Sequence, residues 1–418
     1  MGIQLTQEIY DLFCLLYADD IVIFADSIIK LQHLIDILYK FCTKWRMEVN
    51  LDKTKIIVFR KGGHLSRWEN WHFGGKSIDV VSYYKYLGLM LSSRNNWSKA
   101  IFTLASQASK ALNMLSITRW KLEYFDFHTH FRLFDTMILP ILCYGSEIWG
   151  YLHYDVLEKI QRKWCRKFLG VPNHTTNEAV LGECGRLPIY FHTLKRCIRF
   201  WLKLIELPDN RLPKQAYKML HNLDNLGRHT WATSIKNILF SFGFGFVWLS
   251  QEVGNKELFL SSFEMRVTDL LKQQWFARLS LKPKMRLYVQ YKSMLEPEKY
   301  LKLHCCHNII RIFACFRCGV LPLAIEEGRR ENVDALVRVC KVCSFNSVED
   351  EYHFLLVCPL YSELRKEYLP RKIISEPNVY KFNKLLNSNN SEEIFKLCHF
   401  VYKAFKLREQ TLSQSVNM

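Results

Sequence analysis

Two apolar runs with a pair of acidic residues between them constrain the start of this chain more than any other feature. The runs cover residues 12–17 and 21–25, and the acids between them are Asp19 and Asp20. Apolar runs separated by a short polar turn predict two antiparallel strands joined in a hairpin. The pattern therefore predicts a hairpin with buried strands that holds two carboxylates at a fixed point.

Two carboxylates at the tip of a tight hairpin repel each other unless a cation neutralises them. Mg²⁺ prefers oxygen ligands, with one or two carboxylates from the protein and the rest from water and substrate phosphates. In nucleotidyl transfer, two such ions activate the attacking hydroxyl and stabilise the leaving group. Adjacent aspartates in a turn are nevertheless most often ordinary turn residues. The acidic pair alone leaves both interpretations open.

The residues after the hairpin predict one helix and two more strands. Ser27 is suited to be a helix N-cap, and apolar residues recur at helical spacing from Leu31 to Trp45. Residues 56–59 form an apolar run that predicts a buried strand, and residues 84–91 predict another. The start of the chain is therefore expected to mix strands and helix.

Three stretches in this part of the chain resemble a known family. Residues 15–21 read Leu-Leu-Tyr-Ala-Asp-Asp-Ile, residues 50–54 read Asn-Leu-Asp-Lys-Thr, and residues 84–88 read Tyr-Lys-Tyr-Leu-Gly. In this order and spacing they resemble motifs C, D and E of reverse transcriptases from non-LTR (LINE-type) retrotransposons. The resemblance implies an RNA-directed DNA polymerase whose intact form acts in target-primed reverse transcription on RNA and DNA, with dNTPs as its small-molecule substrates.

The resemblance also implies roles for individual residues. Asp19 would bind both catalytic Mg²⁺ ions, and Asp20 would give weaker support. Lys53 would act as a general acid or contact a phosphate, although a solvated lysine after a turn is the alternative. Tyr86 and Gly88 belong to motif E, the primer grip, and would contact nucleic acid.

The same resemblance implies residues upstream of the hairpin. The family's polymerase site needs another aspartate, on a motif A strand, and a fingers segment that holds the incoming nucleotide. Only 18 residues precede Asp19, and none of them is expected to supply such a strand. We therefore expect a C-terminal fragment of a reverse transcriptase that is inactive alone, because two-metal catalysis requires both ions to be held.

The charge of the chain points to a polyanionic partner. The net charge is +18, from 58 Lys and Arg against 40 Asp and Glu. Such an excess favours nucleic acid and, less often, an anionic membrane. With 418 residues, of which 49% are hydrophobic and 23% charged, the chain is expected to fold into two or three globular domains.

No targeting or membrane segment is recognised in the sequence. The first residues lack the pattern of a signal peptide. The longest apolar stretch, residues 238–250, contains two glycines and is shorter than the roughly 20 residues that a spanning helix needs. We therefore expect an intracellular protein of the nucleus or cytoplasm, not secreted. In that reducing environment the 14 cysteines favour metal binding over disulfides.

Two basic amphipathic helices are predicted further along the chain. Residues 157–169 place an apolar stripe that includes Trp164 opposite a basic face, and residues 194–203 repeat the pattern around Trp201. In the resembled family this region is a helical thumb that grips the template–primer duplex. A solvated basic face is the alternative, and both tryptophans are expected in the core. The residues expected to contact phosphates are Arg162, Lys163, Arg166, Lys167, Lys195 and Arg199.

A cysteine–histidine module follows. Cys340, Cys343, His353 and Cys358 have the residue types and the spacing of a closed tetrahedral Zn²⁺ site. Such a site can fold a segment that is too small for its own core. The module resembles the C-terminal CCHC zinc knuckle of many non-LTR elements, which is thought to contact RNA or target DNA. Buried free cysteines are the alternative.

A second group of Cys and His residues comprises His304, Cys305, Cys306, His307, Cys315 and Cys318. Its Cys315–Cys318 pair could bind a metal with another dithiol, but it lacks closing ligands at a suitable spacing and is expected to belong to the core.

The sequence thus predicts an α+β fold that is mostly helical, with a small β palm remnant. The expected domains are a palm remnant with motifs C, D and E (1–95), a helical thumb (96–207), a helical connecting region (208–335), a CCHC zinc knuckle (336–370) and a C-terminal helical tail (371–418).

Two alternatives stay open at this point. The chain could be a non-catalytic nucleic-acid-binding protein that retains the thumb and knuckle, with Asp19 and Asp20 as relics. The palm remnant could also fail to fold without further strands, because a small sheet exposes its edges to aggregation.

Overall fold

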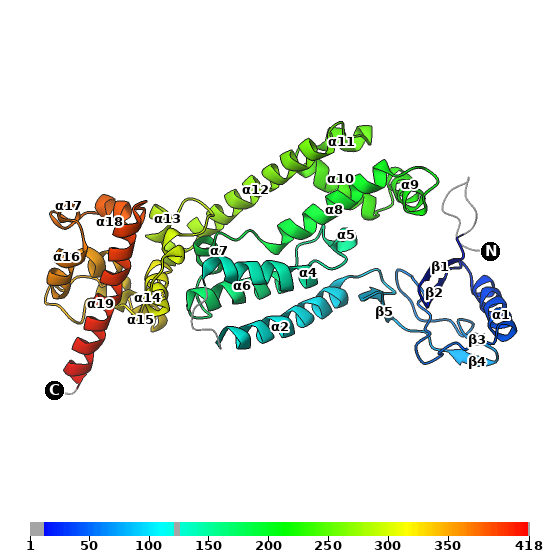
Figure 1. The fold of residues 1–418 in the computed structure, drawn as a ribbon, viewed down its shortest axis with the longest axis horizontal. Coiled ribbons are helices and arrows are strands. Elements are labelled where there is room, and N and C mark those ends of the chain that lie inside the picture. Colours follow the sequence, from blue (N-terminus) through cyan, green and yellow to red (C-terminus); the bar gives the residue numbers. More distant parts are fainter. Residues whose placement is uncertain (1–11, 121–125, 417–418) are drawn as a thin grey trace. The chain divides into compact units, whose positions relative to one another are not determined.

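The structure, a computed structural model, describes residues 12–120 and 126–416. It divides into two compact units, each built from separate stretches of chain. Unit 1 comprises Met1–Gln107, Ile141–Val156 and His192–Glu264, and unit 2 comprises Ala108–Pro140, Leu157–Phe191 and Met265–Met418. Strands occur only near the N-terminus of the described chain, and helices make up most of the rest (Figure 1). The predicted class, a mostly helical α+β fold, is confirmed.

Unit 1 begins with three separate antiparallel hairpins. The paired strands are β1 (Cys14–Tyr17) with β2 (Asp20–Ile23), β3 (Trp71–Phe73) with β4 (Lys76–Ile78), and β5 (Tyr83–Tyr86) with β6 (Leu89–Ser92). The first pair has Tyr17 opposite Asp20, so Ala18 and Asp19 form a two-residue turn. The predicted acidic hairpin is therefore confirmed.

Helix α1 (Ile28–Lys44) follows the first hairpin and carries the small core of this region. Its N-cap is Ser27, as predicted, and the Ser27 hydroxyl accepts a hydrogen bond from the Lys30 N–H at 3.4 Å. Ile35 of α1 packs with Ile56, Trp71 and Ile78. The apolar side of α1 thus covers the β3–β4 hairpin.

Two strand predictions for this region were wrong. Residues 56–59 make one isolated bridge, between Ile56 and Val80, and Phe59 is 62% exposed. Residues 84–91 form the β5–β6 hairpin and not one strand. The cause is the turn, because Leu87 (φ 45°) and Gly88 (φ 84°) both adopt the positive φ that a type I′ hairpin turn requires.

The predicted burial of the first hairpin was also wrong. Leu16 is 70% exposed and Tyr17 is 63% exposed. Within the described residues, β1 and β2 pair only with each other, so both outer edges of this two-stranded ribbon lack a partner strand. The acidic tip is formed, but the strands next to it are exposed, since Leu15 and Ile21 are 37% and 47% exposed as well.

From α2 onward, unit 1 is mostly helical. Three long helices contribute residues to both units, namely α2 (Ser98–Trp120), α8 (Ile189–Glu206) and α12 (Lys256–Ser280). The shorter helices of unit 1 are α5 (Ser146–Trp149), α9 (Leu212–Asn225), α10 (Trp231–Ser241) and α11 (Gly245–Ser250). Trp201 of α8 is completely buried, as predicted, and its indole N–H donates to the Tyr217 hydroxyl of α9 at 2.9 Å.

Unit 2 contains the remaining helices. Its longer helical elements are α3 (Phe127–Leu133), a π-helical turn (Phe134–Ile138), α6 (Asp155–Leu169, from Leu157 onward), α7 (Asn177–Cys184), α14 (His307–Arg317), α15 (Ala324–Arg330), α18 (Val379–Leu386) and α19 (Ser391–Val416). Its short elements include α13 (Tyr288–Tyr291), α16 (Ser362–Tyr368), α17 (Arg371–Ile374) and a π-helical turn at His353–Val357. The C-terminal helix α19 packs on α14 and α16. None of the helices in the described part of the chain combines the length and apolarity that crossing a bilayer requires.

A buried ion pair lies inside unit 2. The Nε–H of Arg317 on α14 donates to both carboxylate oxygens of Glu183 on α7, at 2.9 and 3.2 Å. The Tyr288 hydroxyl donates to the same carboxylate at 2.8 Å. Burial acts to raise the pKa of Glu183, but the guanidinium outweighs it, so this pKa lies below its ordinary value. Both partners are therefore charged, and each depends on the other.

Replacing Arg317 by Met is expected to destabilise the protein by about 3–5 kcal/mol, because it leaves the buried Glu183 carboxylate without its counter-ion. Urea unfolding measures this loss. The matched control is Lys396→Met, which removes a cation from the exposed Lys396–Glu392 pair of α19 and should cost less than about 1 kcal/mol. Equal losses in the two variants would show that the buried pair has no special role.

Candidate functional site

The acidic pair sits where the sequence predicts it. Asp19 is in the β1–β2 turn after Ala18, whose φ is 52°, and Asp20 is the first residue of β2. Both aspartates are exposed. Two neighbouring carboxylates open to solvent suit a hard divalent cation, which completes its shell with water and phosphate oxygens.

Hydrogen bonds join the segments that resemble motifs D and E. Asn50 closes a turn, because its side-chain oxygen accepts from the Lys53 N–H at 3.1 Å and its carbonyl accepts from the Thr54 N–H at 3.0 Å. The Tyr84 hydroxyl of β5 donates to the Lys53 carbonyl at 3.0 Å. Among the described residues, no hydrogen bond joins either segment to Asp19. Hydrogen bonds among the described residues therefore join two of the three predicted segments.

The β5–β6 turn is held by a side chain that the sequence analysis did not select. The Tyr144 hydroxyl donates to the Leu87 carbonyl at 2.5 Å. A Cβ added at Gly88 would lie 3.2 Å from the Tyr144 ring. Gly88 is thus required both for its positive φ and for the close approach of Tyr144. Tyr86 is half-buried in β5 beside this turn.

Most of the basic residues of α6 donate hydrogen bonds to neighbouring parts of the protein. The Arg166 guanidinium donates to the Thr175 carbonyl at 2.8 Å and to the Asn177 side chain at 2.6 Å. Burial lowers the pKa of Arg166. On the same helix, Lys163 donates to Asn113 at 3.2 Å and Lys167 to Ser116 at 2.5 Å, both on α2, and Arg162 is half-buried. The predicted apolar stripe is buried, with Trp164 only 1% exposed.

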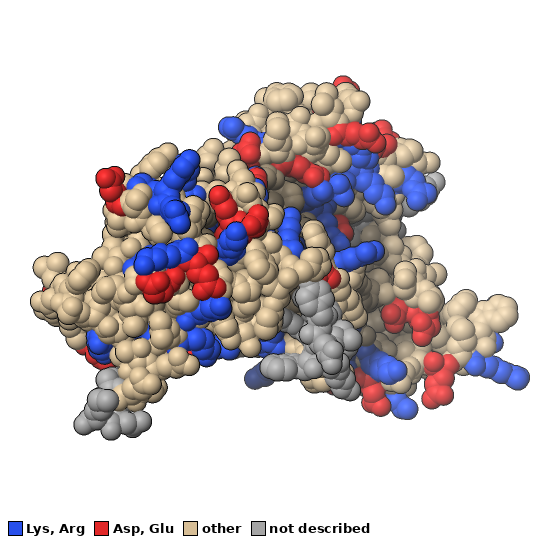
Figure 2. Space-filling model, turned by 60° about the vertical axis from the view of Figure 1, so that its left-hand side comes forward, with Lys and Arg blue, Asp and Glu red and all other residues tan. Residues whose placement is uncertain are grey.

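The basic residues of α8 share one acidic partner. Lys195 lies 2.6 Å and Arg199 lies 3.3 Å from the carboxylate of Glu264 on α12. At several places on the face in Figure 2, lysine and arginine side chains lie beside acidic ones. Part of the positive charge is therefore compensated locally, a property that the spacing of basic residues does not show.

The four predicted zinc ligands lie together. One ligand atom from each of Cys340, Cys343, His353 and Cys358 lies within 4.8 Å of all the others. We call this group the Cys/His cluster. His353 Nε2 is 3.5 Å from Cys343 Sγ, so this ring nitrogen faces the thiols. Three sulfurs and one imidazole nitrogen at this separation are the donor set of a structural Zn²⁺ site, and the residues fit the ion.

Local backbone structure brings these ligands together. An antiparallel bridge between Val339 and Val348 closes the loop that carries the first two cysteines. The Cys340 N–H donates to the Ser347 carbonyl at 2.9 Å. His353 starts a single π-helical turn, and the Cys358 N–H ends it by donating to the His353 carbonyl at 2.8 Å. A knuckle loop and a helical turn thus face each other.

Hydrogen bonds among the thiols shift their acidity in the absence of metal. The pKa of Cys358 is lowered because the Cys340 thiol donates to it. The same bond, helped by burial, raises the pKa of Cys340 to about 12. Burial raises the pKa of Cys343. Thiolate is the metal-binding form, so Zn²⁺ binding here would release protons.

The second Cys/His group is core only in part. Cys315 and Cys318 of the α14 region are buried, as predicted. His304, Cys306 and His307, for which no core position was predicted, are exposed where the chain enters α14 at His307.

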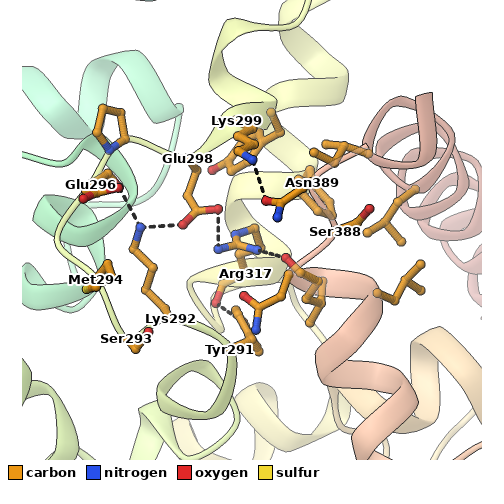
Figure 3. A pocket seen from close by; sticks show the side chains of 18 residues that line it. Tyr291, Lys292, Ser293, Met294, Glu296, Glu298, Lys299, Arg317, Ser388 and Asn389 are labelled. Carbon is orange, nitrogen blue, oxygen red and sulfur yellow. Dashed lines mark hydrogen bonds and ion pairs between the residues drawn. The ribbon is translucent and has the colours of Figure 1, made fainter. Parts of the chain in front are cut away.

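A polar hollow of about 190 Å³ in unit 2 was not predicted. Figure 3 shows Lys292, Glu298 and Arg317 pointing toward one another within it, and Arg317 and Glu298 are 3.0 Å apart. Lys299 donates to the Asn389 side chain at 2.5 Å. The charges of Lys292 and Arg317 are compensated by Glu298 and Glu183, whereas Lys299 contacts a neutral amide.

Known proteins match parts of the chain. Residues 2–91 match the reverse transcriptase (RNA-dependent DNA polymerase) family. A transposon-derived protein of Caenorhabditis elegans is 31% identical over 139 residues, which are 32% of this chain and 48% of the relative. The chain thus spans about half the length of this relative.

The matched residues 2–91 contain the acidic hairpin, the Asn50 turn and most of the β5–β6 hairpin. Through this segment the chain is similar to the reverse transcriptase family, and the chain is also similar to a transposon-derived protein.

Proposed function

We propose that this chain derives from the RNA-directed DNA polymerase of a non-LTR retrotransposon and binds RNA and DNA. The observation that carries the proposal is the exposed Asp19–Asp20 tip, which lies in the family segment together with the joined Asn50 and Tyr84 segments. In this proposal residues 1–95 are the palm remnant, 96–207 the thumb, 208–335 a connecting region, 336–370 the zinc knuckle and 371–418 a tail. The compartment is the nucleus or cytoplasm.

In the intact enzyme, Mg²⁺ would neutralise charge on the incoming triphosphate and lower the pKa of the primer hydroxyl. Asp19 would hold the ions, with Asp20 beside it. Lys53 is exposed on the Asn50 turn, where its amine has room to reach a phosphate. Tyr86 and Gly88 would position the primer strand, with Tyr144 holding the turn that carries Gly88.

The 418-residue polypeptide alone is expected not to extend a primer. Its hairpin tip supplies carboxylates from one point, whereas two metal ions must be held at a fixed separation. A primer-extension assay with Mg²⁺, an RNA template and a DNA primer tests this expectation, with Asp19→Ala as the matched control. Strong extension that Asp19→Ala abolishes would contradict the proposal of an incomplete site.

A second candidate is a nucleic-acid-binding protein without catalysis, and the distribution of charge favours it. Residues 96–335 contain 34 Lys and Arg against 21 Asp and Glu, so most of the excess charge lies in the proposed thumb and connecting region. Phosphate contacts by Lys and Arg supply most of the affinity of sequence-independent binding. Such binding would persist in Asp19→Ala.

Glu264→Gln is expected to tighten RNA binding about five- to ten-fold at about 0.1 M salt, because it frees Lys195 and Arg199 for phosphate contacts. The slope of log affinity against log salt concentration should steepen by about 1. Fluorescence anisotropy over a salt series measures both quantities. The control Glu392→Gln also removes one negative charge, but from the exposed pair with Lys396. Equal effects of the two variants would show that α8 is not part of the proposed RNA-binding interface.

We also propose that the Cys/His cluster binds Zn²⁺. Metal analysis of protein purified without chelator should give about one zinc per chain, and Cys343→Ser should reduce it below half, because a closed structural site needs all four ligands. Cys306→Ser is the matched control, since Cys306 is exposed and lies outside the cluster. Less than half a zinc per chain in the unaltered protein would refute the site.

A further inference from the structure

We propose that the Cys/His cluster is an internal clasp that fastens the C-terminal helix α19 through Glu349 and Arg408, and that it is not a nucleic-acid contact. The inference rests on the zinc site proposed above. In this inference, the role of the zinc site is to hold the buried Glu349 carboxylate in position to bind helix α19.

Glu349 lies between the two ligand pairs and is built into the knuckle by its backbone. Its N–H donates to the Arg338 carbonyl at 3.0 Å, next to the Val339–Val348 bridge. Its carbonyl accepts from the Ile325 N–H at 3.1 Å. The side chain is 1% exposed. The position of this carboxylate is therefore set by the same loop that carries Cys340 and Cys343.

The Glu349 carboxylate accepts its hydrogen bonds from groups inside the protein. Arg408 of α19 donates to both of its oxygens, at 2.6 and 2.7 Å, and is itself 2% exposed. The Ala324 N–H at the start of α15 donates to one oxygen at 2.7 Å. The Cys340 thiol lies 3.8 Å from the other oxygen. One acid thus connects a predicted zinc ligand with two helices.

The second ligand pair is fastened in a similar way. The Arg365 guanidinium of α16 donates to the Cys358 carbonyl at 2.5 Å. Helix α16 packs on α19, so both sides of the cluster are connected to the C-terminal helix. Breaking a buried ion pair leaves an uncompensated charge, which is costly. Arg408 therefore favours a folded knuckle, and a folded knuckle favours a docked α19.

Charge argues against a polyanion at the cluster. Residues 336–370 contain four Lys and Arg against five Asp and Glu. Two of the four bases donate to carbonyls of the same unit, since Arg338 reaches Val333 and Ile325, and Arg365 reaches Cys358. Lys341 and Lys366 each face a glutamate. Three thiolates around one Zn²⁺ would add a further negative charge, whereas phosphate binding requires cations.

Hydrogen–deuterium exchange of the full-length, zinc-loaded chain tests the clasp. Removing zinc with a chelator should raise exchange in residues 391–412 at least about tenfold and leave residues 28–44 of α1 unchanged. Adding zinc back should restore protection. Unchanged protection of α19 after verified zinc loss would overturn the inference.

The Arg408→Met variant tests the clasp independently of zinc binding. This variant should keep about one zinc per chain while exchange in α19 rises, and Arg408→Lys should restore part of the protection. Cys343→Ser should lose both zinc and protection, yet change RNA affinity less than about twofold. If Cys343→Ser weakens RNA binding strongly while α19 stays protected, the cluster is a nucleic-acid contact and the clasp is wrong. If the unaltered chain binds no zinc, both the proposed zinc site and the clasp that rests on it are wrong. Arg408→Met then still tests the Glu349–Arg408 anchor.

Discussion

The buried pair of Glu183 and Arg317 is the interaction on which unit 2 depends. The guanidinium donates hydrogen bonds to Glu183 and to the Leu386 carbonyl, forms an ion pair with Glu298, and lies over the ring of Tyr291. A buried guanidinium is tolerated only when such partners saturate it. Stretches of chain that are far apart in sequence must therefore converge before the charge is stabilised, which makes the packing of this unit cooperative.

The C-terminal part of unit 2 repeats this arrangement with Arg408. In both places a fully buried arginine reaches a carboxylate that backbone structure holds still, on α7 for Glu183 and in the knuckle loop for Glu349. The partners differ in how they are held. Glu183 lies in a regular helix, whereas Glu349 lies in a short loop with one isolated bridge. A loop of this kind needs a further constraint, and the four ligands around it can supply one through a metal ion.

Sequence patterns predicted what depends on neighbours in the chain. The acidic hairpin, the N-cap at Ser27 and the buried stripe around Trp164 follow from local spacing and were confirmed. Long-range partners could not be predicted, because Glu183 and Arg317 are 134 residues apart and no periodicity links them. For the same reason the pairing of Lys195 with Glu264 was missed. For the proposed site residues, the structure gives the positions, but the roles remain predictions.

The exposure of the first hairpin bears on what its carboxylates can do. Metal-assisted phosphoryl transfer needs ligands held within a fraction of an ångström, which rigid packing normally provides. Here the tip is defined by the β1–β2 register, but Leu16 projects into solvent and nothing in the described chain buries it. Asp19 and Asp20 therefore have the residue types of a metal site, and the β1–β2 register sets their position. In the proposal, nucleic-acid binding rests on basic helices whose apolar faces are buried, as Trp164 of α6 and Trp201 of α8 show.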